Sequence, residues 1–276
     1  MTDRAAWMRA QFNRAARQHG VTLDGPALCG VHDRTISGRV TDHQTARWLR
    51  VIAVPTDQAH GVVWDGPITA TEITGVRGPE LFTVGHWTAQ DQTIRAELWE
   101  LITEPICAPH ETLTEILTLP ASWWPNLHAC LDRLARHPTT RTPRNQAQIT
   151  AAMHRAYGLH VDTRVEHWVT QHGDLRWTNL TRAAPYLLDW EFWGMAPAGT
   201  DAATLYCTSL LVPEVAATVY HQFRHVLDTP DGRIAQLCLC IQLGRHPDCG
   251  ALHEPLRQLA HRLGADVVGE GCISRP

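Results

Sequence analysis

Hydrophobic and polar positions alternate with a helical period at the start of the chain and with a strand-like period soon after it. Between residues 4 and 19, Ala5, Met8 and Phe12 recur on one helical face, arginines occupy the other, and Gly20 is a natural stop. Runs of β-branched and apolar residues then predict strands. These runs cover residues 29–32, 34–40, 46–55 and 80–106. The first hundred residues are therefore expected to be mostly β-structure after one helix.

A helical period replaces this pattern in the second half of the chain. The clearest helix covers residues 122–137, where apolar side chains recur on one face. Further helices are predicted at residues 145–157, 200–211, 213–226, 232–243 and 252–263. A chain of 276 residues is large for one hydrophobic core, and Pro105, Cys107 and Pro109 mark a boundary at the end of the last predicted strand region. We expect two domains, a β-rich one at residues 1–104 and a mostly helical one at residues 105–276.

The most informative segment contains two predicted strands and the loop between them. Val165–Val169 is β-branched and aromatic, which is typical of a strand. Asp174 and Asn179 lie five residues apart on the loop that follows. A second, short apolar strand is predicted at Pro185–Leu188, and Asp189 stands at its end. The order is therefore loop carboxylate, loop carboxamide and strand-end carboxylate.

These groups match the needs of phosphoryl transfer. Asp174 could take or orient the proton of an attacking hydroxyl, and Asn179 and Asp189 offer the oxygen ligands that Mg²⁺ prefers beside phosphates. Arg176, two residues beyond the carboxylate, could neutralise charge on the transferred group. An alternative is a loop in which Asp and Asn only make turns, which explains the residue types but not their ordered spacing.

The motif H-G-D-L-R-W-T-N-L, followed by L-L-D-W-E, resembles the catalytic loop and metal-binding segment of the protein kinase-like fold. Gly173 and the Asp-Trp-Glu at 189–191 are most similar to the aminoglycoside phosphotransferase and choline kinase branch. The resemblance covers residues 34–211 but is specific only at 172–191. It implies an α+β, two-lobe fold with a small β-rich N-lobe and a larger, mostly helical C-lobe. It also implies that Asp201 braces the catalytic loop. The other interpretation of Asp201 is an ordinary helix N-cap, and the two roles are compatible.

In this family a strand lysine contacts the nucleotide phosphates and pairs with a helix glutamate. The resemblance places Arg50, on the strand at 46–55, in the lysine position, with Arg47 as the second candidate. Arginine keeps the charge but is longer and planar. Glu72, on a helix expected at Pro67–Thr74, would be its partner. A surface arginine and a solvated glutamate are the alternatives.

Two further contacts with ATP are implied by the same resemblance. The small pair Ser37 and Gly38 is the candidate for a turn over the phosphates, although no G-x-G-x-x-G is present and an ordinary hairpin turn fits equally. Leu101 lies in the segment Glu100–Thr103, which would form the hinge that presents backbone groups to adenine.

Composition restricts the partners and the compartment. The net charge of −4 argues against nucleic acid or a membrane surface as a charge-driven partner. The N-terminus carries no long apolar run of a signal peptide, and the eight cysteines are scattered, so a cytoplasmic protein is expected. The chain has 24 arginines and no lysine, which a genome of high GC content or selection against lysine would explain.

The acceptor is not identified by the sequence. Residues 213–264, where it should bind, contain five acids against five arginines and five histidines, which weakens the expectation of a polycationic aminoglycoside. A neutral hydroxylated small molecule and a peptide serine or threonine remain open. The predicted function is a Mg²⁺- and ATP-dependent kinase of the antibiotic or natural-product type. The alternative is an inactive kinase-like protein that binds a nucleotide or peptide, against which the intact set of Asp174, Asn179 and Asp189 argues.

Overall fold

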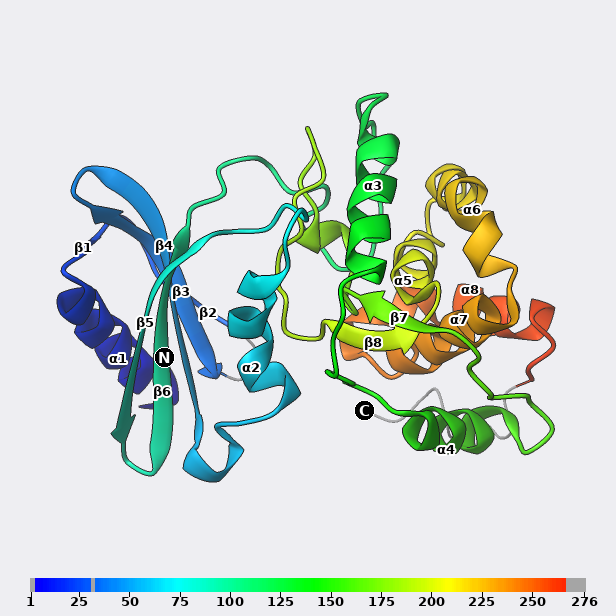
Figure 1. The fold of residues 1–276 in the computed structure, drawn as a ribbon, viewed down its shortest axis with the longest axis horizontal. Helices are drawn as coiled ribbons and strands as arrows, with labels where there is room; N and C mark the ends of the chain where they lie inside the picture. The colour runs from blue at the N-terminus through cyan, green and yellow to red at the C-terminus, as the bar shows by residue number, and fades with distance from the viewer. Residues whose placement is uncertain (1–2, 31–32, 267–276) are drawn as a thin grey trace. The chain divides into compact units, whose positions relative to one another are not determined.

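The computed structural model describes residues 3–30 and 33–266 and divides the chain into two compact units. The first unit comprises the chain up to Glu72 together with Gly78–Thr103. The second comprises Ile73–Arg77 and the chain from Glu104 onward. A β-sheet makes up most of the first unit, and helices make up most of the second (Figure 1). Among the described residues, no helix has the length and apolar character needed to cross a membrane.

The first unit is an antiparallel sheet with a long helix on one face. The strand order is β1-β3-β4-β6-β5, and β2 also pairs with β3. The β3–β4 and β5–β6 hairpins turn through His43–Gln44 and Gln90–Asp91, all with positive φ, as two-residue turns that match strand twist require. The elements are α1 (Asp3–His19), β1 (Thr22–Leu23), β2 (Leu28–Cys29), β3 (Thr35–Asp42), β4 (Thr45–Pro55), α2 (Val62–Thr69), β5 (Leu81–Ala89) and β6 (Gln92–Glu100).

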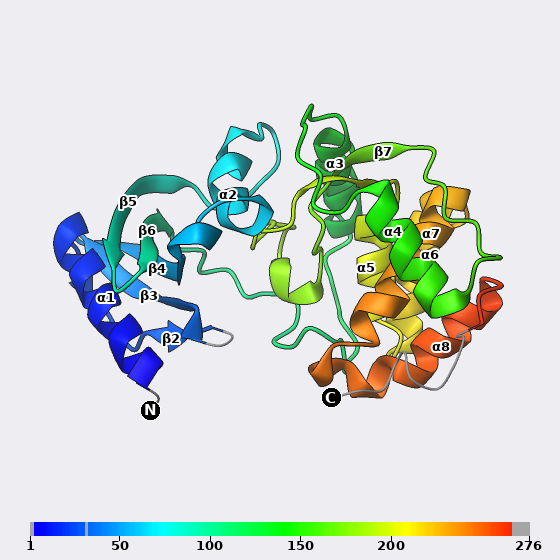
Figure 2. The same ribbon diagram turned by 90° about the horizontal axis from the view of Figure 1, so that it is seen from below.

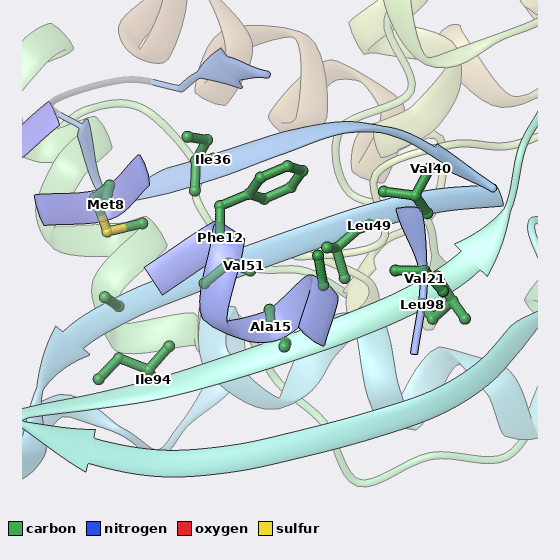
Figure 3. Packing of buried hydrophobic residues seen from close by; sticks show 13 residues of the cluster. Met8, Phe12, Ala15, Val21, Ile36, Val40, Leu49, Val51, Ile94 and Leu98 are labelled. Carbon is green, nitrogen blue, oxygen red and sulfur yellow. The ribbon is translucent and has the colours of Figure 1, made fainter. Parts of the chain in front are cut away.

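The core of this unit lies between α1 and the sheet (Figure 3). The helix predicted at 4–19 is confirmed, and its apolar face carries Met8 and Phe12 into the core. Leu49 and Val51 of β4 are buried in the same core. Because side chains alternate along a strand, Arg50 points to the other face of the sheet. There its neighbour Ile52 packs against Trp64 of α2.

The turn expected at Ser37 and Gly38 is wrong, because both residues lie in the middle of β3. Ser37 pairs with Leu28 on one side and with Arg50 on the other, so the strand is flanked on both edges. A side chain at Gly38 would start 3.3 Å from the ring of Phe12. The glycine therefore serves the close approach of α1 to the sheet and not a phosphate loop.

The helix expected at Pro67–Thr74 begins and ends earlier. It starts at Val62, after Gly61, whose N–H donates to the Asp65 carboxylate at 3.0 Å. Pro67 lies inside the helix, and a 3₁₀ turn, Ala70–Glu72, follows it. Residues 62–66, before Pro67, thus form the first part of α2.

The second unit is built around α7, which is buried along most of its length. It packs against α4, α5, α6 and α8, and α5, α6 and α7 lie side by side in Figure 2. The elements are α3 (Trp123–Ala135), α4 (Gln146–Tyr157), β7 (Trp168–Gln171), β8 (Gly194–Pro197), α5 (Thr200–Thr208), α6 (Pro213–Leu227), α7 (Pro230–Leu243) and α8 (His253–Arg262), with 3₁₀ turns at Trp177–Asn179 and Pro247–Leu252.

Two strand predictions in this unit need correction. The strand expected at Val165–Val169 is β7, which begins only at Trp168 and pairs with β8. The strand expected at Pro185–Leu188 does not form. The N–H of Leu187 donates to the Arg77 carbonyl and that of Leu188 to the Asn179 carbonyl, so no single partner strand is available.

Candidate active site

The loop after β7 begins with a buried histidine. The Nε2 of His172 lies 2.9 Å from the Leu188 carbonyl, and because a carbonyl only accepts, Nε2 carries the proton. The ring stacks edge-on against Trp190 at 4.6 Å. Burial lowers the pKa of His172, so it remains neutral. This histidine ties the loop to the segment that carries Asp189 and is not itself positioned as a base.

Asp201, in the first turn of α5, fixes the backbone of this loop. Its carboxylate accepts the N–H groups of His172 at 2.8 Å and Gly173 at 2.9 Å. The helix N-cap is Gly199, so Asp201 is not an ordinary cap and instead makes the bracing contact. Gly173 has φ of 82°, and a Cβ there would lie 2.4 Å from the Phe192 carbonyl oxygen, which is why glycine stands in this position.

The two polar groups of the predicted motif, Asp174 and Asn179, do meet. The Nδ2 of Asn179 donates to the Asp174 carbonyl at 2.8 Å and lies 3.4 Å from its Oδ2. The 3₁₀ turn makes this contact by folding the chain back, with the Asn179 N–H on the Arg176 carbonyl. Burial raises the pKa of Asp174, and Arg176 counters only part of that rise. The side chain of Asp174 is still 17% exposed, so its carboxylate is accessible to a substrate.

A hydrogen bond ties the chain just before Asp189 to the same turn. The N–H of Leu188, the residue that precedes Asp189, donates to the Asn179 carbonyl. Asp189 is exposed and adopts φ of 61°, a left-handed conformation that aspartate tolerates better than most residues. Because Nδ2 of Asn179 is committed to Asp174, its Oδ1 is turned away from that carboxylate. Asn179 and Asp189 both carry oxygen atoms of the kind that Mg²⁺ prefers, and their role as its ligands remains a prediction.

Arg176 is buried between two carboxylates. Its Nε donates to Asp174 Oδ1 at 2.6 Å, and its Nη1 donates to Glu111 Oε2. Burial alone would lower its pKa, but Asp174 and Glu111 raise it. Glu111 stands on the segment after the first unit and was not predicted, because 65 residues separate it from Arg176 and no motif marks it.

Glu111 also belongs to a group of ligand-type side chains. Its carboxylate, the His246 ring and the Cys249 thiol place their atoms within 4.8 Å of one another. His246 and Cys249 lie three residues apart in the sequence, but Glu111 comes from a segment more than 130 residues earlier, so no local spacing marks the three as one group. The guanidinium of Arg176 already supplies a cation to Glu111, so we assign the group to the surroundings of Arg176 and not to a metal.

In the first unit, the predicted Arg50–Glu72 ion pair is wrong. Glu72 is exposed on the 3₁₀ turn after α2, whereas Arg50 Nη1 lies 3.3 Å from Glu97 Oε2. Glu97 stands directly opposite Arg50 in the β4–β6 ladder. The early end of α2 leaves Glu72 beyond the helix, and the cross-strand carboxylate takes its place. Leu101 follows the last residue of β6, and its role as a hinge residue remains a prediction.

The similarity of this chain to known proteins lies in its fold. No protein-family model matches the sequence, and no curated protein matches it. Aminoglycoside phosphotransferase APH(4)-Ia superposes with a TM-score of 0.63 at 13% identity, over 94% of this chain and 99% of its own. A ternary complex of a thermostable mutant of that enzyme with AMP-PNP and hygromycin B gives 0.63 at 13% identity, over 92% and 98%.

A natural-product kinase has the same architecture. Amicoumacin kinase hAmiN, in complex with AMP-PNP, Ca²⁺ and Ami, gives a TM-score of 0.53 at 12% identity, over 92% of each chain. The α+β, two-lobe fold predicted from the sequence is confirmed. This chain has the protein kinase-like fold in the form found in aminoglycoside phosphotransferases.

Proposed function

We propose that the protein is a Mg²⁺- and ATP-dependent phosphotransferase that moves the γ-phosphoryl group to a hydroxyl of a small molecule. The observation that carries this proposal is the convergence of Asp174, Arg176 and Asn179 in one turn, whose backbone Asp201 fixes. A turn that served only structure would not need a partly exposed carboxylate with a buried guanidinium beside it.

Asp174 is the base in this mechanism. It accepts the proton of the acceptor hydroxyl as the hydroxyl oxygen bonds to the γ-phosphorus, and the bond from that phosphorus to the bridging oxygen of ADP breaks. Arg176 holds Asp174 Oδ1 at 2.6 Å, so the carboxylate has one defined orientation. Catalysis rests on this positioning and on charge neutralisation.

Asn179 and Asp189 would hold Mg²⁺. The ion neutralises phosphate charge when bound. Asn179 donates its amide NH₂ to Asp174, and its Oδ1, which lies 3.5 Å from Thr178 Oγ1, would face the ion. Arg50, on β4, would contact the nucleotide phosphates, and its charge suits that contact.

A small hydroxylated molecule is the favoured acceptor. Two of the structures of this fold named above are complexes with a small molecule beside the nucleotide analogue, hygromycin B in one and Ami in the other. The charge balance of residues 213–264 favours an acceptor less cationic than a typical aminoglycoside. A peptide serine or threonine is the second acceptor class to assay.

Replacing Asp189 by alanine should remove the Mg²⁺ dependence of nucleotide binding, because the proposed carboxylate ligand is lost. Thermal melting with Mg²⁺ plus ATP, GTP or adenosine measures this. A ligand at 100 times its Kd adds about 2.7 kcal/mol to the free energy of unfolding, which is a visible shift. The wild type should show a larger shift for ATP with Mg²⁺ than without it, and Asp189→Ala should show the same small shift in both.

The matched control is Asp132→Ala, an exposed aspartate on α3. It should keep the wild-type response to Mg²⁺. An unchanged Mg²⁺ dependence in Asp189→Ala would refute the assignment of this ligand. If the wild type melts at the same temperature with and without every nucleotide, the result supports the alternative interpretation, a kinase-like protein without turnover.

In the pH profile of kcat/KM, the fall in activity toward acid, the acid limb, should be centred at a pH above the ordinary aspartate pKa of about 3.9. Asp174 must be ionised to accept a proton, and burial raises its pKa, so activity falls at a higher pH than for a solvated aspartate. The charge of Glu111 contributes to this rise. Glu111→Gln should therefore move the limb to lower pH, measured in pH–rate profiles against the exposed control Glu115→Gln. A limb that moved to higher pH would mean that Glu111 acts mainly by holding Arg176.

A further inference from the structure

The opposite face of the first unit's sheet contains a buried carboxylate with three donors. Glu97 on β6 is 0% exposed. Its Oε1 accepts from Arg95 Nε at 2.6 Å. Its Oε2 accepts from Trp99 Nε1 at 2.8 Å and lies 3.3 Å from Arg50 Nη1. A carboxylate satisfied in this way has one orientation, and so does the guanidinium of Arg50 that it contacts.

The strand register produces this cluster. Arg50 and Glu97 are directly opposed in the antiparallel β4–β6 pair, and Arg95 lies two residues earlier on the same face of β6. Arg95 in turn donates through Nη1 to the Trp64 carbonyl at 2.5 Å, and its guanidinium lies 4.3 Å from the Trp64 ring centre. The cluster is therefore anchored to α2 through its backbone and not through a helix glutamate.

The electrostatics keep Glu97 ionised. Burial by itself raises its pKa, but Arg50, Arg95 and the indole N–H of Trp99 together lower it. The guanidinium groups of Arg50 and Arg95 both contact the one carboxylate of Glu97, and the charge of Asp65 also acts on Arg95. The Nη2 of Arg95 has no hydrogen-bond partner among the described residues.

We propose that Glu97 is the positioning residue for Arg50, in the role that the sequence analysis gave to Glu72. This inference rests on the proposed function, in which Arg50 contacts the nucleotide phosphates. Glu97 holds the long arginine side chain in one rotamer, and Arg95 in turn holds the Glu97 carboxylate. Arg50 held in this way favours a polyphosphate over a nucleoside, and its fixed orientation compensates for the planar guanidinium that replaces an ammonium group.

The test is the affinity of Glu97→Gln for Mg²⁺-ATP and for adenosine, measured by calorimetry. Glutamine keeps the shape and loses the charge. ATP should bind about tenfold more weakly, as expected for one lost charge-assisted hydrogen bond, and adenosine should bind as in the wild type. The exposed control Asp57→Asn, in the same unit, should change neither affinity. An equal loss for ATP and adenosine would show a purely structural role and overturn the proposal.

A double-mutant cycle identifies the route of the effect. In an Arg50→Ala background, Glu97→Gln should have no further effect on ATP affinity, because it acts through Arg50. The same tenfold loss in that background would overturn the proposal. So would a larger ATP-specific loss from Glu72→Gln than from Glu97→Gln. Wild-type protein that bound adenosine but showed no preference for ATP would refute the proposed function itself, which separates the two failures.

A milder variant covers the case in which Glu97→Gln does not fold. Trp99→Phe keeps an aromatic side chain but removes the five-membered ring of the indole with the N–H that holds Oε2 of Glu97. ATP affinity should fall about two- to fivefold while adenosine affinity stays constant, in line with the loss of a single neutral donor. A Trp99→Phe protein with an unchanged ratio of ATP to adenosine affinity would contradict the positioning role.

Discussion

Replacing Asp174 by asparagine should reduce turnover by about 10²–10⁴-fold, the contribution typical of a positioned general base, while nucleotide affinity changes little. Asparagine matches the size of aspartate and can still accept from Arg176 Nε, so the turn should persist. It cannot take the proton of the acceptor hydroxyl. Single-turnover assays with an acceptor, beside calorimetric binding of ATP, measure both quantities.

Asp132→Asn is the matched control for this substitution, since it makes the same chemical change on the exposed face of α3. Its turnover should equal that of the wild type. Loss of ATP binding in Asp174→Asn, together with turnover, would show that Asp174 holds the metal or the fold of the loop and is not purely the base. Wild-type turnover in Asp174→Asn would remove it from the mechanism.

The features that the sequence predicts correctly are mostly those that depend on residues close together in the chain. Asp174 and Asn179 are five residues apart, and one 3₁₀ turn brings them together. The helix at Asp3–His19 follows from its own period. Asp201 was expected from the resemblance, and the structure adds the two N–H groups that it binds.

The errors arise where tertiary packing decides. The turn predicted at Gly38 is wrong because Gly38 is required by the close approach of Phe12. The sequence alone does not distinguish such a glycine from a glycine in a turn. The ion-pair partner of Arg50 depends on the register of β4 and β6, which no local pattern encodes. The sequence therefore predicts Glu72 as the partner, whereas the structure has Glu97. Glu111 reaches Arg176 across 65 residues and had no local signal at all.

Asp201→Asn should lower both stability and turnover. An aspartate accepts two N–H groups with its two oxygens, whereas asparagine turns an NH₂ donor toward one of them. One of the N–H groups of His172 and Gly173 then faces a donor inside the protein, at a cost of about 1–3 kcal/mol. The displaced loop carries Asp174, and a shift of about 1 Å in a catalytic group can reduce turnover by about 10²-fold. Chemical denaturation and single-turnover assays measure the two effects.

Asp231 on α7 provides a control for Asp201, because the two aspartates make similar backbone contacts. It is also buried, and its carboxylate likewise accepts two backbone N–H groups, from Glu166 at 2.8 Å and His167 at 3.0 Å. The same carboxylate also contacts the exposed ring of His167, whose Nδ1 lies 2.9 Å from Oδ2. Those groups precede β7, whereas the groups held by Asp201 follow it. Asp231→Asn should therefore lose a similar stability yet keep near wild-type turnover well below its melting temperature. Equal losses of turnover in the two variants would mean that Asp201 acts through general stability, and a selective loss in Asp201→Asn would show that it positions the catalytic loop.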